Sequence, residues 1–280
     1  MILSTEALKL DLPLTATRLK RFIKDYVQNT KAKGVVLALS GGIDSSTAAA
    51  LSALAIGGDK VLALSMPEKE TYNSLDIEHT RKLAEKFSFI LETIDITNIL
   101  KAYYKSIPTF EPEDLVSKGN IKARARIICA YYYANHQNRI VVGSSDKSET
   151  MMGYFTKWGD VAADISPLMD LYKTQVRQLA AYIGVPKEIV EKPSTPQLWP
   201  GQLAETELGI KYETLDLVLV GLESFMAPEE IANQLNLRLE LVEEVKTRWL
   251  SSEHKRRAPL AMKMGYRTAG MDFRLPYKSP

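Results

Sequence analysis

The segment from Ser40 to Ser46 constrains the fold more than any other part of the chain. It reads SGGIDSS and separates an apolar run, 34–39, from an alanine-rich stretch, 44–56. A short apolar run of this kind predicts a buried parallel strand, and the stretch after it predicts a helix. Two adjacent glycines permit a tight turn, and N–H groups of the turn and of the helix N-terminus converge on one point. The segment therefore predicts an anion site where a strand ends.

Strand and helix patterns alternate along the first two thirds of the chain. The predicted strands cover 34–39, 60–66, 89–96 and 139–143, and the predicted helices cover 15–30, 44–56, 73–87, 118–137, 173–183, 228–235 and 240–255. This order predicts an α/β fold, a doubly wound, Rossmann-like parallel sheet with helices on both faces and a helical extension at its C-terminal end. All four strands are expected to be buried. Ligands of such sheets gather at the carboxyl ends of the strands.

We expect one domain over residues 1–280. An N-terminal helix at 15–30 precedes an α/β core of about 34–184, and a substrate loop with the C-terminal helices follows from about 185 to 280. The proline-rich stretch 192–201 is the best candidate for a linker or a lid.

Composition excludes several classes of protein. Lys+Arg 36 against Asp+Glu 34 leave a formal net charge of +2, which does not indicate a nucleic-acid or membrane-surface protein. The single cysteine, Cys129, cannot form an internal disulfide or a cysteine cluster for zinc, and it fits a reducing compartment. Neither a secretory signal nor an apolar stretch of about 20 residues is visible. We expect a cytoplasmic protein that contacts no membrane.

The serine hydroxyls of the 40–46 segment can donate to an anion, and Asp44 can serve as the helix N-cap or bind a hard cation that bridges phosphate oxygens. A tight turn with an ordinary cap is the structural alternative. No Gly-Lys-Ser/Thr follows the glycines, so this is not a Walker loop, and the third glycine of the dinucleotide fingerprint is also missing. The pattern favours another kind of phosphate chemistry.

SGGIDSS resembles the pyrophosphate loop of the ATP pyrophosphatases, which cleave ATP between its α and β phosphates and activate a carbonyl oxygen as an adenylate. This superfamily includes NAD synthetase, GMP synthetase, asparagine synthetase, argininosuccinate synthetase, and the tRNA thiolases and lysidine synthetases. The loop alone does not choose among them.

Further segments resemble NAD synthetase. They are KGNIKARAR at 118–126, GSSDKSE at 143–149, GYFTKWGDVAADISPL at 153–168, LYKTQVRQLA at 171–180 and ETELGIKY at 205–212, with a shorter echo at 254–255. The resemblance implies an ammonia-dependent ligase: deamido-NAD attacks the α-phosphate of ATP, and ammonia then converts the adenylate to NAD, with release of pyrophosphate and AMP. It also implies a homodimer, with Arg126 and the tyrosines at 131–133 as interface candidates. The tyrosines can equally be core residues.

The position of Glu149 supports the resemblance. Glu149 follows a strand end, as Asp44 does, so both carboxylates should meet at one sheet edge and hold Mg²⁺ together. Lys173 begins a predicted helix and would add positive charge near phosphate, unless it is a surface lysine.

The resemblance implies the other site residues. ATP would contact Ser40, Gly41, Gly42, Ile43, Asp44, Ser45, Ser144, Lys173 and Thr195; deamido-NAD would contact Arg124, Lys157, Asp164, His254 and Lys255. Asp44, Lys173 and Asp164 would be the catalytic residues. For His254 and Lys255, favourable charge at a helix end is the structural alternative, and Arg126 is expected to form a structural pair or to contact a partner chain.

The nitrogen donor is expected to be ammonia, from solution or from a separate partner, because the chain has neither the length nor a suitable cysteine for a glutamine amidase domain. Two rival functions stay open. A tRNA-modifying ATP pyrophosphatase would share the first loop but should have a basic face or paired cysteines. A nucleotide sensor would keep the loop and lack Glu149, Lys173 or the substrate segments.

Overall fold

The computed structural model describes residues 2–269 and 272. Its centre is a parallel sheet of four strands, β1 (Gly34–Ala38), β2 (Val61–Ser65), β3 (Ile90–Thr93) and β4 (Arg139–Val141), in the order β3-β2-β1-β4. Val36 of β1 lies opposite Leu62 of β2 and Val141 of β4. Since β1 has a neighbour on each side, its carboxyl end is surrounded by the ends of β2 and β4. The segment after β1 therefore opens at the middle of the sheet edge.

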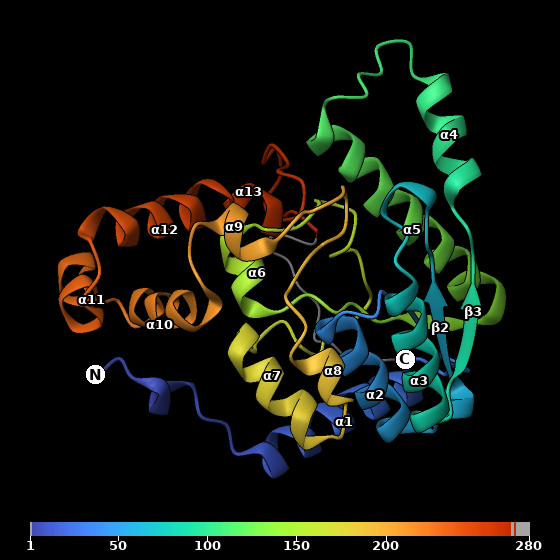
Figure 1. Cartoon of the computed structure of the whole chain (residues 1–280), viewed down its shortest axis with the longest axis horizontal. Helices are drawn as coiled ribbons and strands as arrows, with labels where there is room; N and C mark the ends of the chain where they lie inside the picture. Colours follow the sequence, from blue (N-terminus) through green and yellow to red (C-terminus); the bar gives the residue numbers. More distant parts are fainter. Residues whose placement is uncertain (1, 270–271, 273–280) are drawn as a thin grey trace.

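Helices cover both faces of the sheet, as the sequence predicts (Figure 1). One face packs against α1 (Leu12–Asn29), α2 (Ile43–Ile56), α3 (Ser74–Phe87), α7 (Lys173–Tyr182) and α8 (Lys187–Val190); the other packs against α4 (Thr97–Ser106) and α5 (Leu115–Gln137). Alternate residues of β1 point to opposite faces, so Val35 and Leu37 belong to the first cluster and Val36 to the second. The α/β doubly wound expectation is confirmed.

A third hydrophobic cluster lies beside the sheet layers, under the C-terminal helices (Figure 1). It is formed by α6 (Lys147–Met152), α9 (Ala204–Leu208), α10 (Tyr212–Glu223), α11 (Pro228–Leu235), α12 (Leu239–Ser251) and the N-terminal 3-10 helix η1 (Thr5–Leu8). The short helix α13 (Glu253–Arg256) and the 3-10 turns η2 (Gly58–Lys60) and η3 (Lys69–Thr71) complete the elements. Because α6 belongs to this cluster and also lies at the sheet edge, the C-terminal helices can influence the site.

Several expected boundaries differ from the structure. The helix expected at 15–30 begins at Leu12, because Asp11 accepts a hydrogen bond from the Leu14 N–H. The helix expected at 118–137 begins at Leu115, where Asp114 serves in the same way. The stretch 240–255 divides into α12 and α13 at Ser252.

The expectation that 89–96 is a buried strand is wrong in part. The strand covers only Ile90–Thr93, and Ile90 is 42% exposed, because β3 lies at the edge of the sheet and the helices do not cover it completely. The short helices α4, α6, α8 and α9, and the longer α10, were not predicted from the sequence. Among the described residues, no helix combines the length and apolar character needed to cross a bilayer.

Candidate active site

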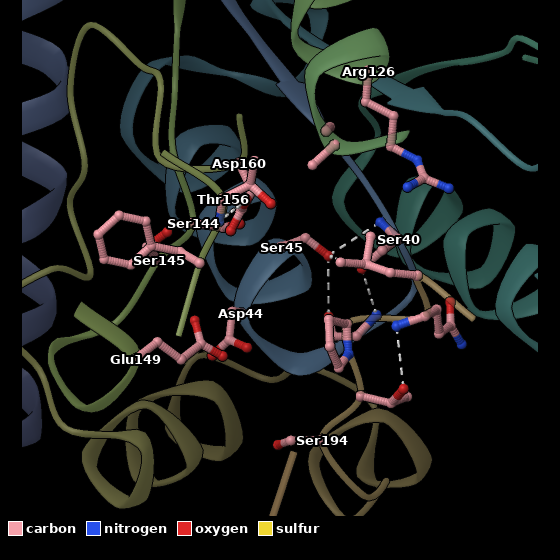
Figure 2. A pocket seen from close by; sticks show the side chains of 18 of the residues that line it. Ser40, Asp44, Ser45, Arg126, Ser144, Ser145, Glu149, Thr156, Asp160 and Ser194 are labelled. Atoms are coloured by element: carbon pink, nitrogen blue, oxygen red, sulfur yellow. Dashed lines mark hydrogen bonds between the residues drawn. The ribbon is translucent and has the colours of Figure 1, made fainter. Parts of the chain in front are cut away.

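The turn after β1 has the shape expected of an anion-binding loop. Gly41 has φ +77, and a Cβ at this position would lie 2.7 Å from the Asp76 carbonyl oxygen, so only glycine fits without strain. The Ser45 hydroxyl accepts from the Ser40 N–H at 3.2 Å and donates to the Gly42 carbonyl at 3.2 Å (Figure 2). The N-cap of α2 is Gly42 and not Asp44, so the capping alternative for Asp44 is wrong. Its carboxylate is left for other contacts.

An ammonium group surrounded by carboxylates lies beside this loop. Lys173 Nζ is 2.6 Å from Asp44 Oδ2, 2.8 Å from Asp146 Oδ2 and 2.8 Å from Glu149 Oε1. Lys173 and Asp146 are fully buried. Figure 2 shows the carboxylates of Asp44 and Glu149 turned toward each other. The structure thus brings together Asp44, Glu149 and Lys173, which the sequence proposes, and adds Asp146, which it does not.

The protonation of this cluster follows from burial and charge. Burial raises the pKa of Asp146 to about 6 against the opposing effect of Lys173, and it raises the pKa of Glu149 well above its usual value. Burial also lowers the pKa of Lys173, but the three carboxylates outweigh it and hold that pKa well above the usual range. A single cation therefore faces three acids, and the cluster favours a second positive charge.

The donor set fits a hard divalent cation. One carboxylate oxygen from each of Asp44, Asp146 and Glu149 lies within 4.8 Å of the others. Asp44 Oδ1 is buried and has no hydrogen-bond partner among the described residues. Carboxylate oxygens, with phosphate and water, are the ligands that Mg²⁺ prefers. Asp146 could have been found in the sequence, since it lies in the same post-strand segment as Glu149.

Helix α6 carries this chemistry and is held at both ends. Asp146 caps its N-terminus by accepting from the Glu149 N–H at 2.8 Å. At its C-terminal end, Arg256 donates to the carbonyls of Thr150 and Met151 at 3.0 Å, and Arg248 donates to that of Met152 at 3.3 Å. Basic groups are favourable there because the last carbonyls of a helix lack partners within it. The cap comes from α12 and α13, so the C-terminal helices help to position Glu149.

A cavity of about 460 Å³ opens at the carboxyl edge of the sheet, which is within the range of small-molecule sites. Its lining includes the expected residues Ser40, Gly42, Ile43, Asp44, Ser45, Ser144, Glu149, Thr195 and Lys255. Lys173 and Gly41 are not in this lining, but Lys173 contacts Asp44 and Glu149, which are, and Gly41 lies between Ser40 and Gly42 in the turn. Lys255 also donates to the Gly153 carbonyl, and its ammonium is 4.7 Å from the centroid of the Phe155 ring.

Besides Lys173 and Gly41, four expected site residues lie outside this lining, among the described residues: Arg124, Lys157, Asp164 and His254. Three of them are linked through backbone carbonyls. Arg124 donates to the Lys157 carbonyl at 3.0 Å, and Lys157 Nζ donates to the His254 carbonyl at 2.8 Å. Asp164 instead accepts from the Val141 N–H at 2.8 Å and from the Tyr131 hydroxyl at 3.3 Å, so it ties the end of β4 to α5.

Sequence reasoning did not select several residues that line the cavity. Arg126, expected to form a structural pair or a partner contact, faces the cavity and donates to the Met66 carbonyl at 3.3 Å. Arg248 also lines it. Ser194 precedes Thr195, and its hydroxyl is buried without a partner among the described residues, whereas Thr195 Oγ1 accepts from the Gln197 N–H. Ser194 lies in the proline-rich stretch 192–201, so the sequence indicates the segment but does not distinguish this residue within it.

The proline-rich stretch lies against α3 beside the turn. The carboxylate of Asp76 accepts from Lys192 Nζ with one oxygen and from Gln197 Nε2 with the other. Asp76 is also the residue whose carbonyl lies next to Gly41. The stretch expected to be a lid is therefore joined, through one side chain, to the wall of the anion-binding loop.

A buried ion pair supports another wall of the cavity. Lys122 Nζ is 2.6 Å from Glu68 Oε1 and 2.8 Å from Glu70 Oε2, and Lys122 is fully buried. Burial raises the pKa of Glu68, but the contacts with Lys122, Glu70 and Thr71 outweigh it and hold that pKa below the usual value. Glu68 lines the cavity.

Comparisons with known proteins all indicate one family. The family model NAD synthase matches residues 15–259. The chain is 49% identical to the NH(3)-dependent NAD(+) synthetase of Methanocaldococcus jannaschii over 86% of this chain and 93% of that protein. It is 45% identical to the protein of the same name from Hyperthermus butylicus, over 91% of this chain and 92% of that one.

Solved structures give the same picture. The NMN synthetase of Francisella tularensis has a TM-score of 0.80 and 34% identity, over 91% of this chain and 99% of that one. The NH3-dependent NAD synthetase of Campylobacter jejuni has a TM-score of 0.76 and 30% identity, over 91% and 100%.

Replacing Lys122 with methionine should lower the free energy of unfolding at pH 7 by about 3 kcal/mol, because Glu68 would be left buried without its cation. Urea unfolding measures this, and the double variant K122M/E68Q should recover part of the loss. The lowered pKa of Glu68 gives stability that is present above its unfolded pKa and lost as the pH falls through the folded value. K122M should weaken this acid dependence. A loss below about 0.5 kcal/mol would show that the pair adds nothing.

Proposed function

The chain belongs to the NAD synthase family, and we propose that the cavity at the carboxyl edge of its sheet holds ATP and deamido-NAD together. The reaction is that of the NH3-dependent NAD+ synthetases: ATP-dependent amidation of deamido-NAD with ammonia, through an adenylate, to give NAD, AMP and pyrophosphate. The enzyme is a ligase that forms a C–N bond. The observation that supports our placement of this reaction most strongly is the lysine and carboxylate cluster directly beside the glycine turn.

The turn would bind the pyrophosphate that leaves. The N–H groups after β1 and at the start of α2 stabilise negative charge without reorganisation, and Lys173 adds a cation. The nicotinate carboxylate then attacks the α-phosphorus, an O–P bond forms, and the bond to the β-phosphate breaks. Ammonia attacks the activated carbonyl, the nitrogen loses a proton, and AMP leaves. No protein nucleophile is needed, so the main contribution of the protein is alignment and charge.

Asp44 and Glu149 are the residues we propose to hold Mg²⁺, with Asp146 as a third candidate. The ion would neutralise charge on the phosphate oxygens. The residues of the chain would complete the site: Ser40, Gly41, Gly42, Ile43, Ser45, Ser144 and Thr195 would contact ATP. Ser194 is a further candidate, because its buried hydroxyl lacks a partner among the described residues.

We propose that deamido-NAD extends from the cavity toward Arg124, Lys157, His254 and Lys255, with Asp164 near its nicotinate end. Most of these residues lie beside the cavity and not in its wall, which supports a site completed by a second copy of the chain. Arg124, Ile128 and Tyr132 are spaced by one helical turn on α5, and all three are exposed. This apolar stripe next to Arg124 supports the homodimer. We also propose that the enzyme acts in the cytoplasm, on the evidence of its single cysteine.

Purified protein supplied with ATP, Mg²⁺, deamido-NAD and ammonium should form NAD, AMP and pyrophosphate. Chromatography of the nucleotides measures this reaction. Glutamine in place of ammonium should give no NAD above background. Because the NMN synthetase of Francisella tularensis is a structural neighbour, nicotinate mononucleotide serves as the competing substrate and should react with a lower kcat/KM. Faster formation of NMN than of NAD would assign the chain to the mononucleotide reaction, and ADP as the product would contradict both.

Replacing Asp44 with asparagine should lower kcat at least about 100-fold, since one charge is lost from the proposed metal site and from the contact with Lys173. The melting temperature should change little, because Asp146 and Glu149 still neutralise the lysine. Asp170→Asn is the matched control, as the Asp170 side chain is 98% exposed. Full activity of D44N would refute the role of Asp44.

A further inference from the structure

Asp216 on α10 is a fully buried carboxylate outside the cavity lining, among the described residues. Its Oδ1 accepts from the Ser148 hydroxyl at 2.5 Å, and its Oδ2 accepts from the Thr174 N–H at 2.9 Å. Ser148 is fully buried as well, and its hydroxyl accepts from the Lys173 N–H at 2.9 Å. Asp216 thus reaches the backbone of Lys173 through a single hydroxyl group.

These contacts lie at the N-terminal ends of two helices, α6 and α7. Lys173 and Thr174 open α7, and Ser148 precedes Glu149 on α6. The first N–H groups of a helix have no partner within it, and a negative charge beside them is favourable. One carboxylate therefore satisfies the beginning of α7 and fixes it against α6. The relative position of Lys173 and Glu149 depends on the same contact.

The other end of Lys173 also meets α10. Tyr212, one turn before Asp216 on that helix, is fully buried, and the centroid of its ring is 5.2 Å from Lys173 Nζ. A lysine side chain is flexible, so its ammonium needs supports on more than one side to stay in place. Helix α10 supplies two of them, one at the backbone and one at the ammonium.

We infer that Asp216 is a positioning residue for Lys173 in the adenylation of deamido-NAD. This inference rests on the proposed function. A buried carboxylate is unfavourable unless its oxygens accept hydrogen bonds. If α10 and α7 needed only to be packed together, an apolar side chain would be sufficient at this position. The carboxylate is needed because two donors, Ser148 Oγ and Thr174 N, require an acceptor each. An asparagine offers only one acceptor oxygen, so one of these donors would lose its partner.

Asp216→Asn should lower kcat about 10-fold and leave the KM for deamido-NAD within about twofold, because α7 and its lysine would move while the proposed dinucleotide contacts remain. Leu219→Ala is the control. Leu219 is buried on the same helix in the hydrophobic cluster under the C-terminal helices, and its truncation should cost about 2–5 kcal/mol of stability. Assayed below its melting temperature, L219A should keep the kcat of the wild type, and D216N should not.

Ser148→Ala is the second variant, because it removes the linking hydroxyl and leaves the carboxylate in place. It should lower kcat to a similar extent. The kcat of S148A/D216N should be no lower than that of the less active single variant, since both changes break the same chain of contacts. If D216N does not fold, S148A decides. Wild-type kcat in the folded variants would overturn the inference alone, and absence of NAD formation by the wild type would overturn the proposed function. An equal fall of kcat in L219A would reduce Asp216 to a stabilising residue.

Discussion

The ammonium of Lys173 among three carboxylates is the interaction on which the rest of the site depends. Its partners come from two elements, Asp44 from α2, and Asp146 and Glu149 from the segment that opens α6, whereas Lys173 itself opens α7. Burying such charges is unfavourable unless each finds its partner at good geometry. The surrounding structure supplies that geometry. Basic side chains from α12 and α13 cap α6. Tyr212 of α10 lies beside the Lys173 ammonium, and Asp216 of α10 reaches the Lys173 backbone through the Ser148 hydroxyl. The C-terminal helices are therefore part of the active-site framework.

The charge distribution around the cavity suits a polyanionic ligand. Arg126, Arg248 and Lys255 line it, and each donates to backbone carbonyls. Their positive charge is not cancelled by a carboxylate in those contacts, so it is available to phosphate groups. Asp44, Asp146 and Glu149 gather at one corner, where a divalent cation would be held. Other carboxylates line the walls, and two of them, Glu68 and Asp76, are paired with Lys122 and Lys192. Wall cations without a paired acid and an acidic corner fit a triphosphate bound with its metal.

The sequence predicts candidate site residues where they lie together in a short local motif. The glycine turn, its place after a strand and the position of Glu149 after another strand follow from local pattern, and they predict the sheet edge that carries the cavity. Asp146 was within reach, in the same segment as Glu149. Asp216 and Arg256 could not be recognised, because each acts on a helix far away in the chain: Asp216 accepts from Ser148, 68 positions away, and Arg256 donates to Thr150, 106 positions away. Nothing local marks a carboxylate or guanidinium as a cap. The buried strand expected at 89–96 failed for a related reason: sequence does not reveal which strand lies at the edge.

The proposed reaction places the α-phosphate of ATP, which the nicotinate carboxylate attacks, beside Lys173 and its three carboxylates. The most direct measurement uses deamido-NAD with ¹⁸O in its nicotinate carboxylate, incubated with the enzyme, ATP, Mg²⁺ and ammonium, and follows the label by mass spectrometry. If the carboxylate attacks the α-phosphorus, one ¹⁸O atom appears in AMP and none in pyrophosphate. Label in inorganic phosphate with ADP as the nucleotide product, or AMP without label, would contradict attack of the nicotinate carboxylate on the α-phosphorus.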